Sequence, residues 1–431
     1  MNRSSTMNFR RTALALCLAA LTGPALADAA TEQALMQRLD QLARELDAVK
    51  AELAAMKAIP VAAPAPAPLP PPAVAVPEQP ATVLGSYGEI NVNLPSRQSG
   101  DSQLDIRRFV LAMQHRFDPA TKLVTELEVE HAVSSASDAG EVEVEQAYIE
   151  HRVNDTVALR GGLMLMPIGL LNETHEPTTY YGVERNFVET AIIPSTLREA
   201  GAQAVLTFGD GYTLQGGVVT GPDLAKWDYG SEAGPGEGAE TPLGAIHQEA
   251  QLAKARDPSF FGALNWRGIP GLWVGGSAIG GNAVHGTANT PDASYLLWDV
   301  HARYSPGPFK LSALYTQGSF SNTAAFNLLN VGRPTPIPER FDGLLFEAGY
   351  RLWKRDAMRL EPFARWEQFT TGAHYADLGT SLTPERRPNA RVTTAGASFF
   401  LTEGVVLKAD YQWFERNDAA NRLNLGLGWY F

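Results

Sequence analysis

Apolar and polar residues alternate with a period of two through most of residues 83–431. Near the end of the chain, Leu423 and Leu425 would share one face of a strand, while Asn424 would point to the other. Successive side chains of a strand point to opposite faces, so this period predicts strands with one apolar and one polar face. The region should therefore form a sheet that separates an apolar environment from water.

Sixteen segments follow this pattern. They are residues 84–93, 104–117, 121–132, 141–152, 156–167, 200–208, 211–221, 258–267, 271–281, 292–305, 308–319, 341–353, 358–371, 390–401, 404–415 and 420–431. Short turns such as Asp118-Pro119 alternate with long connections such as 168–199 and 222–257. This asymmetry is typical of outer-membrane barrels. We therefore predict an all-β fold, a transmembrane antiparallel β-barrel of about sixteen strands.

Charged residues on the polar face favour this barrel over the main alternative, a secreted β-sandwich with one polar face. In strand 404–415, Leu407 alternates with Lys408, and a Lys or Arg at the middle of a bilayer costs about 2–4 kcal/mol. These charges should face enclosed water instead. The last residue is Phe431, a terminal aromatic residue of the kind that barrel-assembly machinery recognises. We expect the barrel to lie among lipid and lipopolysaccharide in a Gram-negative outer membrane.

The N-terminus has the features of a secretory signal peptide over residues 1–27. Arg10 and Arg11 precede the apolar stretch 12–21, and Ala25-Leu26-Ala27 supplies small residues where a signal peptidase cleaves. The apolar stretch is too short for a stable membrane span. We expect cleavage after residue 27, so that the rest of the chain is exported.

A heptad repeat follows within residues 28–58. Its apolar positions are Leu35, Leu39, Leu42, Leu46, Val49, Leu53 and Met56. Spacings of three and four place them on one side of a helix, which predicts a periplasmic coiled coil; the alternative is a helix that packs on its own domain. Residues 59–82 contain nine prolines and should form a stiff, extended linker. The barrel domain is then residues 83–431.

Composition excludes several classes of protein. The formal net charge is −12 at pH 7 and 19% of the residues are charged, so a surface that binds nucleic acid is not expected. The single cysteine, Cys17, lies in the predicted signal peptide. Disulfides and thiol chemistry are therefore not expected in the exported chain.

Motifs for catalysis are weak. His175-Glu176 begins like a zinc-protease helix, but residue 179 is Thr179 and Pro177 would break the helix. The glycine-rich stretch 230–238 has irregularly spaced glutamates, which fit an external loop better than a cation site. We predict no enzyme, no metal site and no cofactor.

Three short motifs resemble the phosphate-selective porin O and P family. They are Leu104-Asp105-Ile106-Arg107-Arg108, Gly161-Gly162-Leu163 through Pro167-Ile168-Gly169, and Tyr181-Gly182-Val183-Glu184-Arg185. The resemblance covers about four-fifths of the chain. It implies a sixteen-stranded homotrimeric porin in which the loop after the fifth strand folds inward and narrows the channel. In our strand order that loop is 168–199.

The alternation places a set of cations on the inner face, and the predicted constriction loop is mainly acidic. The predicted pore-lining residues are Arg108, Arg116, Lys122, Arg160, Arg303, Arg351, Arg365 and Lys408. The predicted constriction residues are Glu173, Glu176, Glu184, Arg185 and Arg198. Rings of such charges select among solutes, and planar guanidinium groups suit phosphate and carboxylate. Arg108 and Arg160 are the strongest candidates for solute contact, because they lie in or beside the motifs.

The sequence thus predicts an outer-membrane porin for passive diffusion of small hydrophilic solutes, with slight selectivity toward anions such as phosphate. One alternative is a structural tether or adhesion protein, in which the coiled coil links the barrel to the cell wall. A second alternative, a membrane-embedded hydrolase, has no nucleophile–base pair to support it.

Overall fold

The structure is a computed structural model that describes residues 37–38, 40–51, 80–97, 99–135, 137–230, 241–286, 290–379 and 381–431. The chain divides into two units, Met1–Glu78 and Gln79–Phe431. The predicted signal peptide, the glycine-rich stretch from residue 231 and most of the proline-rich linker lie outside the described residues, as do residues 28–36, 39 and 52–58 of the predicted coiled coil. Of the first unit, residues 40–51 are helical, and a coiled-coil partner for them is not shown. Among the described helices, none has the length and apolar character to cross a membrane.

The second unit consists mainly of strands. They are β1 (Thr82–Pro95), β2 (Gln103–Arg116), β3 (Thr121–Glu130), β4 (Val142–Arg152), β5 (Val157–Leu165), β6 (Arg198–Phe208), β7 (Tyr212–Val219), β8 (Ser259–Trp266), β9 (Leu272–Asn282), β10 (Ser294–Tyr304), β11 (Phe309–Phe320), β12 (Arg340–Tyr350), β13 (Trp353–Arg355), β14 (Met358–His374), β15 (Ala390–Thr402), β16 (Val405–Phe414) and β17 (Arg422–Tyr430). Short helices lie between them: η1 (Ser99–Asp101), η2 (Val188–Ile192), η3 (Leu224–Lys226), η4 (Gly244–Ile246), α3 (Thr323–Leu329) and η5 (Asp418–Ala420).

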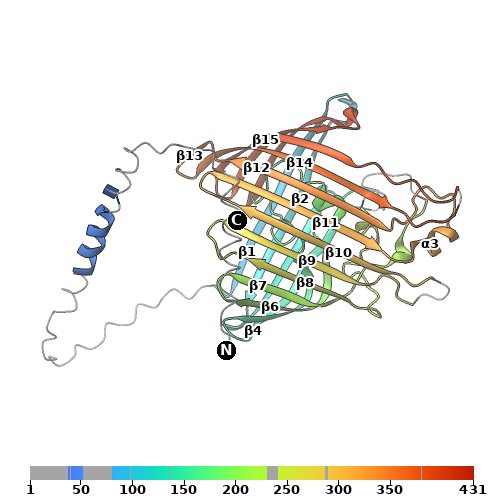
Figure 1. Cartoon of the computed structure of the whole chain (residues 1–431), viewed down its shortest axis with the longest axis horizontal. Coiled ribbons are helices and arrows are strands. Elements are labelled where there is room, and N and C mark those ends of the chain that lie inside the picture. The colour runs from blue at the N-terminus through green and yellow to red at the C-terminus, as the bar shows by residue number, and fades with distance from the viewer. Residues whose placement is uncertain are drawn as a thin grey trace, which may run out of the picture. The chain divides into compact units, whose positions relative to one another are not determined.

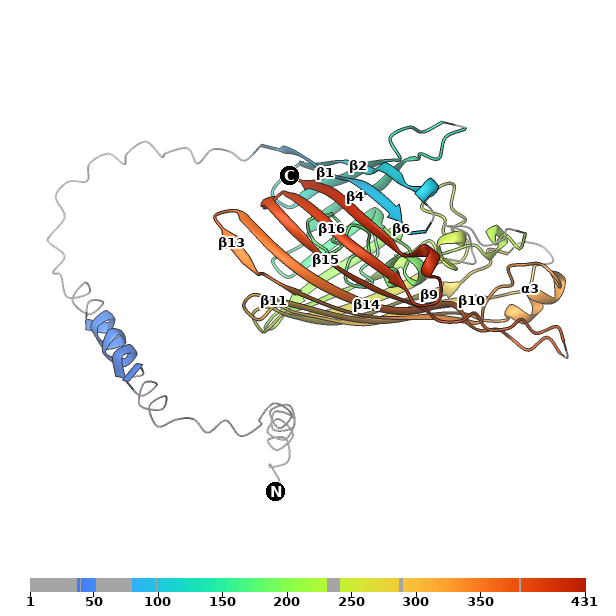
Figure 2. The same cartoon turned by 90° about the horizontal axis from the view of Figure 1, so that it is seen from above.

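The strands close into an antiparallel barrel (Figures 1 and 2). Each pairs with its neighbour in the sequence, and β1 pairs with both β2 and β17. Because β12 and β13 both pair with β14, they are two parts of one barrel strand, and the barrel has sixteen strands. The predicted fold class and strand number are confirmed.

All sixteen predicted strands are present, with ends that differ by only a few residues. The main difference concerns the predicted strand 341–353. Its regular pairing with β14 ends at Gly349 and resumes at Trp353, so Arg351 lies in a break beside the turn to β14. The alternation of apolar and polar residues also ends there, because Leu352 is followed directly by Trp353, a signal that the predicted strand 341–353 did not use.

The outer face of the barrel is apolar and exposed, as the alternation predicts. On β17, Leu423, Leu425 and Leu427 are 39%, 42% and 37% exposed, whereas Asn424 between them is fully buried. Asn424 lies opposite Asp410 of β16 and donates a hydrogen bond to its carboxylate at 2.7 Å. Side chains on the inner face therefore contact one another across neighbouring strands.

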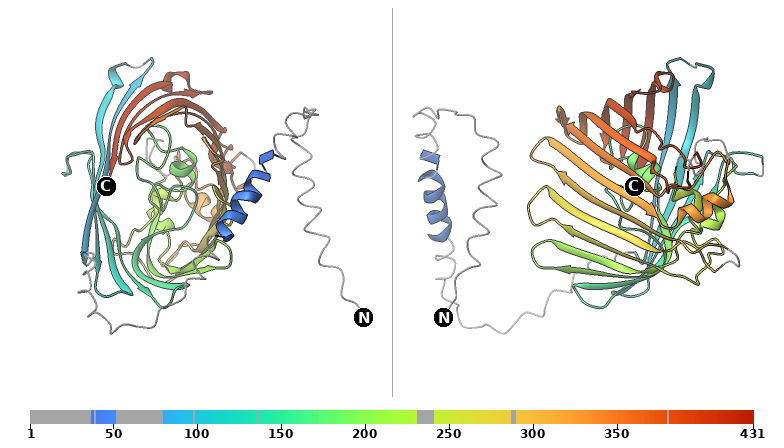
Figure 3. Two further views of the ribbon diagram at one scale, coloured as in Figure 1. Left: turned by 90° about the vertical axis from the view of Figure 1, so that its left-hand side faces the viewer. Right: turned by 45° about the vertical axis from the view of Figure 1, so that its right-hand side comes forward.

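The barrel interior is partly filled by loops (Figure 3). We call residues 166–197, which connect β5 to β6, the inner loop. Ile192 and Ile193 of this loop belong to one buried apolar cluster with Leu297 of β10 and Phe341 of β12. The interior thus contains buried apolar side chains in addition to the charged ones that the sequence places there. Removing this apolar surface from water gives roughly 25 cal/mol per Å², and that burial favours loops folded inside the barrel.

Glycines on the barrel wall make room for the inner loop. A Cβ atom at Gly349 of β12 would lie 2.3 Å from the ring of Tyr181, and one at Gly428 of β17 would lie 2.6 Å from Pro177. Real Cβ atoms essentially never approach other atoms so closely, so the loop can occupy its position only because these wall residues lack a side chain.

We expect Gly349→Ala to displace the inner loop. Overpacking of this kind costs about 1–3 kcal/mol, and it should expose Arg185, which is buried in the loop. Trypsin should then cleave after Arg185 at several-fold lower concentration than in the unaltered protein. Gly262→Ala is the control, because its Cβ would meet only the Gln215 carbonyl at 4.0 Å. Equal protection of Arg185 in both variants would contradict this account of the glycines.

Candidate functional site

The candidate site is the barrel interior, where the inner loop contacts strands far from its own position in the ring. The Tyr181 hydroxyl donates to Glu361 of β14 at 2.7 Å, and the Tyr180 hydroxyl donates to Glu89 of β1 at 2.7 Å. The Val183 backbone N–H donates to Asp410 of β16 at 2.6 Å. The loop therefore spans the interior from β5 and β6 to the opposite wall, and three wall carboxylates hold it there.

Arg108 on β2 is the centre of one buried charge network. Its Nε lies 2.9 Å from Glu89 Oε1 and its Nη1 lies 3.2 Å from Glu128 Oε1, while Nη2 is 3.6 Å from Glu130. The Arg108 side chain is only 7% exposed. This arrangement matches a wall ion-pair network, so Arg108 does not present its guanidinium freely to a passing solute.

Arg365 on β14 is the centre of a second network. It donates to Glu367 at 2.9 Å and to the Tyr181 backbone carbonyl of the inner loop at 3.1 Å. Glu367 in turn accepts from the Phe187 backbone N–H at 2.5 Å. Arg365 is 2% exposed, so this predicted pore-lining residue fixes the loop to the wall.

Near Tyr180, the buried cations Lys408 and Arg185 have nitrogens without a hydrogen bond among the described residues. Lys408 Nζ lies 3.7 Å from the centroid of the Tyr180 ring and has no hydrogen-bond partner. Arg185 donates from Nη2 to the His175 carbonyl at 3.3 Å, but its Nε and Nη1 have no partner. The side of the interior near Tyr180 therefore has hydrogen-bond donors that these protein contacts leave unused.

Other predicted cations are partly exposed near the short-turn end of the interior. Arg160 of β5 donates to Glu150 at 2.8 Å and remains 23% exposed. Lys122 of β3 lies 3.2 Å from the same carboxylate and is 37% exposed. Arg303 of β10 contacts Ser312 at 3.4 Å and stacks over Trp273. Unlike Arg108, these groups combine positive charge with access to water.

The remaining predicted cations lie at the ends of strands. Arg116 is exposed at the end of β2, and Arg351 is exposed in the break between β12 and β13. Arg198, at the start of β6, is buried and paired with Glu143 and Glu249. Arg116 lies opposite Lys122, which shares Glu150 with Arg160, whereas no contact joins Arg198 or Arg351 to Arg160 among the described residues.

The predicted acidic residues of the inner loop have separate partners. Glu173 accepts from Gln215 at 2.8 Å and lies 4.0 Å from Arg160. Glu184 accepts from Asn93 of β1 at 3.1 Å, and Glu176 has one buried oxygen without a partner among the described residues. The loop thus positions carboxylates against the wall at several places.

His175 of the inner loop lies in a buried polar cluster that the sequence did not indicate. Its Nδ1 is 3.0 Å from the Asn172 carbonyl, and its Nε2 is 2.6 Å from the Tyr87 hydroxyl. Tyr87 also donates to Glu145 at 2.7 Å, and His175 Nε2 is 3.3 Å from Glu145 Oε1. Burial lowers the pKa of His175, but the Glu145 carboxylate raises it, and the pKa is raised overall.

Sequence reasoning missed several residues of the interior. Arg267 stacks on Trp273 with its Cζ 4.3 Å from the ring centroid, and Lys310 lies 3.2 Å from Glu361. Arg267 comes just after β8 and Lys310 is near the start of β11. Both lie near the ends of the predicted strands 258–267 and 308–319, so assigning every charged residue of those strands to a face could have identified them.

No protein-family model matches this sequence. An uncharacterized protein of Aquifex aeolicus (strain VF5) is 26% identical over 344 residues, which cover 76% of this chain and 74% of the relative. Among solved structures, OmpF of Salmonella typhi (in complex with daunomycin) matches with a TM-score of 0.55 and 13% identity over 81% of this chain and 97% of its own. The outer-membrane channel DcaP of Acinetobacter baumannii matches with a TM-score of 0.52 and 11% identity over 81% and 97%. An anion-selective porin from Comamonas acidovorans matches with a TM-score of 0.50 and 13% identity over 81% and 99%. The chain therefore has a porin-like fold.

We expect Arg108→Ala to destabilise the protein strongly. The change would leave Glu89 and Glu128 buried without their main cation, and breaking a buried pair in this way costs about 3–5 kcal/mol. Urea titration of the folded fraction in detergent micelles, followed by tryptophan fluorescence, measures the loss.

The matched control is Arg97→Ala. Arg97 pairs with Asp418 at 2.7 Å, but the two side chains are 65% and 60% exposed, and exposed pairs contribute about 0–1 kcal/mol. Similar unfolding midpoints for the two variants would show that the Arg108 network does not hold the wall together.

Proposed function

We propose that this protein is an outer-membrane channel for passive diffusion of small hydrophilic solutes. The observation that carries the proposal is the closed sixteen-stranded ring with an apolar exposed exterior and a charged interior. Only helices and closed barrels satisfy every backbone group in lipid, and the partly exposed charges Arg160 and Lys122 of the interior fit a lumen that water enters. The porin-like fold supports the same conclusion.

Exposed aromatic residues near the short turns support placement in a membrane. Phe208 and Tyr212 stack beside the turn between β6 and β7, and Phe309, just after the turn between β10 and β11, packs on Tyr350 at the end of β12. Aromatic girdles mark the interfaces of outer-membrane barrels. The end with short turns, where β1 begins and β17 ends, would face the periplasm, and the long loops would face lipopolysaccharide.

Anions such as phosphate are the solutes we favour. The partly exposed cations Arg160, Lys122 and Arg303 lie in the interior near the periplasmic end, and Arg267 and Lys310 add to them. The acids near them are largely engaged: Glu150 is bound to Arg160 and Lys122, and Glu361 to Lys310. Glu173 of the inner loop, 38% exposed and 4.0 Å from Arg160, opposes them in part, so we expect only a slight preference for anions where the inner loop narrows the path.

The proposal also covers the oligomeric state of the protein and the assembly of its barrel. We propose a homotrimer in which each barrel has its own pore, and recognition of Phe431 by the barrel-assembly machinery. The exposed apolar surface of the strands can face either lipid or a second barrel. The helix 40–51 has Leu42, Leu46 and Val49 exposed at 54–58% along one side, which suits a periplasmic coiled coil.

Planar-bilayer recording tests the channel. Purified protein should give discrete conductance steps, and reversal potentials in a salt gradient should show a slight preference for anions. The double variant Arg160→Glu and Arg303→Glu should lower the anion-to-cation permeability ratio by about threefold or more, since one charge at 4 Å contributes about 1 kcal/mol even in water. Arg97→Glu, outside the interior, should leave the ratio unchanged. An absence of conductance steps from folded protein would overturn the proposal.

Deletion of residues 28–80 distinguishes the proposed channel function from the alternative function as a structural tether. A channel should keep its single-pore conductance after the deletion, because the strands that close the ring begin at Thr82. A tether should lose its attachment to the cell wall, measured as co-sedimentation of the barrel with purified peptidoglycan. Loss of conductance in a deleted protein that still folds would contradict the assignment of the pore to the barrel alone.

A further inference from the structure

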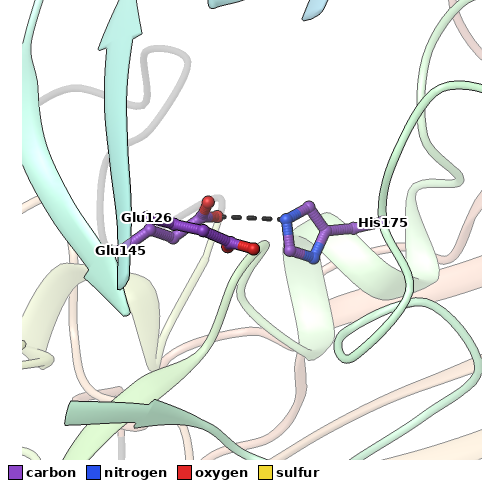
Figure 4. Close-up of side chains that lie close together, drawn as sticks. All are labelled: Glu126, Glu145 and His175. Carbon is purple, nitrogen blue, oxygen red and sulfur yellow. Dashed lines mark ion pairs between the residues drawn. The ribbon is translucent and has the colours of Figure 1, made fainter. Parts of the chain in front are cut away.

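Three side chains from separate parts of the chain converge inside the barrel (Figure 4). Glu126 comes from β3, Glu145 from β4 and His175 from the inner loop. One ligand atom from each lies within 4.8 Å of the ligand atoms of the other two, and His175 Nε2 is 3.3 Å from Glu145 Oε1. Each residue therefore offers a metal-ligating atom to the same small volume.

The histidine is oriented as a metal-bound histidine usually is. Its Nδ1 is 3.0 Å from the Asn172 backbone carbonyl, and its Nε2 faces the Tyr87 hydroxyl at 2.6 Å and Glu145 Oε1 at 3.3 Å. Metal-bound histidines commonly donate their second ring nitrogen to a carbonyl or carboxylate in this way. The Tyr87 hydroxyl, 2.7 Å from Glu145 Oε2, orients the neighbouring carboxylate.

A second observation concerns the Oε1 atom of Glu145. Glu145 is fully buried, and its Oε1 lies 3.3 Å from His175 Nε2 but accepts no hydrogen bond of good geometry from the described residues. A buried charged oxygen without a hydrogen-bond partner is costly. Glu176 Oε2 on the same loop is also buried without a partner. The cluster thus has acceptor capacity that these protein contacts do not use.

The charges of the cluster also favour a bound cation. Glu126, Glu145 and Glu176 are close enough to raise one another's electrostatic energy, and His175 lies beside them. Arg185 adds one positive charge nearby. A dication bound by the first two carboxylates and neutral His175 would offset the remaining repulsion.

We propose that Glu126, Glu145 and His175 form a binding site for a divalent transition-metal cation such as Zn²⁺. One imidazole and two carboxylates suit zinc, which takes nitrogen and oxygen ligands at about 2.0–2.2 Å in a four-coordinate site. Calcium and magnesium prefer six or more oxygen ligands, which this cluster does not provide. Water or Glu176 would complete the coordination.

Such a metal would attach the inner loop to the wall. Two ligands belong to neighbouring strands, paired through Glu126 and Gln146, and the third belongs to the loop. A ligand set drawn from three segments can form only in the folded chain, so binding would stabilise the loop in place. This inference does not depend on the proposed transport function.

Zinc binding by the full-length, tag-free protein in detergent micelles tests the site. Equilibrium dialysis followed by metal analysis should give one Zn²⁺ per chain, retained in the presence of excess Ca²⁺ or Mg²⁺. Glu126→Gln and His175→Gln should each weaken the affinity at least tenfold, in the range seen when a metal site loses an important contact. His374→Gln is the control, because His374 faces only Glu339, at 2.7 Å, and is exposed.

Trypsin sensitivity of Arg185 gives a second readout that needs no transport activity. Zn²⁺ should protect Arg185 in the unaltered protein and in the His374→Gln variant, but not in Glu126→Gln or His175→Gln. Heat-modifiable migration in gels confirms that each variant is folded. The proposal is overturned if the folded protein binds no stoichiometric Zn²⁺, if Ca²⁺ or Mg²⁺ displaces it, or if both cluster variants bind it as tightly as the control.

Discussion

Closure of the ring between β1 and β17 is the constraint on which the rest of the structure depends. Nine residue pairs, from Tyr87 with Tyr430 to Pro95 with Arg422, join the first strand to the last, and Ser86 and Phe431 exchange backbone hydrogen bonds at 3.0–3.1 Å. Closure removes the open edges of the sheet. It also assigns every strand residue to one of two environments, so that the period of two in the sequence becomes a division between inside and outside.

Because the ring is closed, its inward-pointing charged side chains are enclosed in the barrel interior. Charged residues that point inward must be hydrated or paired, and the structure uses both solutions. Arg108 and Arg365 are buried in networks of carboxylates, and those carboxylates also bind the inner loop. Arg160 and Lys122 share Glu150 but stay accessible to water. Buried basic residues thus stabilise the barrel and its inner loop, whereas partly exposed basic residues near the short turns are candidates for contact with solutes.

The fold could be predicted almost completely from the sequence, because period-two alternation and turn residues are local signals. The interior could be predicted only in part. Alternation correctly turns Arg108 inward, but its burial depends on Glu89 and Glu128 on neighbouring strands and on Tyr180 of the loop. His175 was judged by its immediate neighbours in sequence, whereas its partners Glu126 and Glu145 are separated from it by 49 and 30 positions. Contacts of this kind form because the closed ring brings distant parts of the chain together, so no local pattern in the sequence predicts them.

The path of the inner loop affects how long the folded barrel should survive. Its Tyr180 is bound to β1 and its Val183 to β16, so one short segment is anchored on both sides of the β1–β17 junction. Parting the first and last strands would rupture these enclosed bonds together with the ladder itself. The inner loop therefore links the two sides of the β1–β17 junction from inside the barrel. This link raises the free-energy barrier to separating β1 from β17 and slows spontaneous unfolding. Conversely, insertion of the loop and the final zippering of the ring would have to occur in concert during assembly.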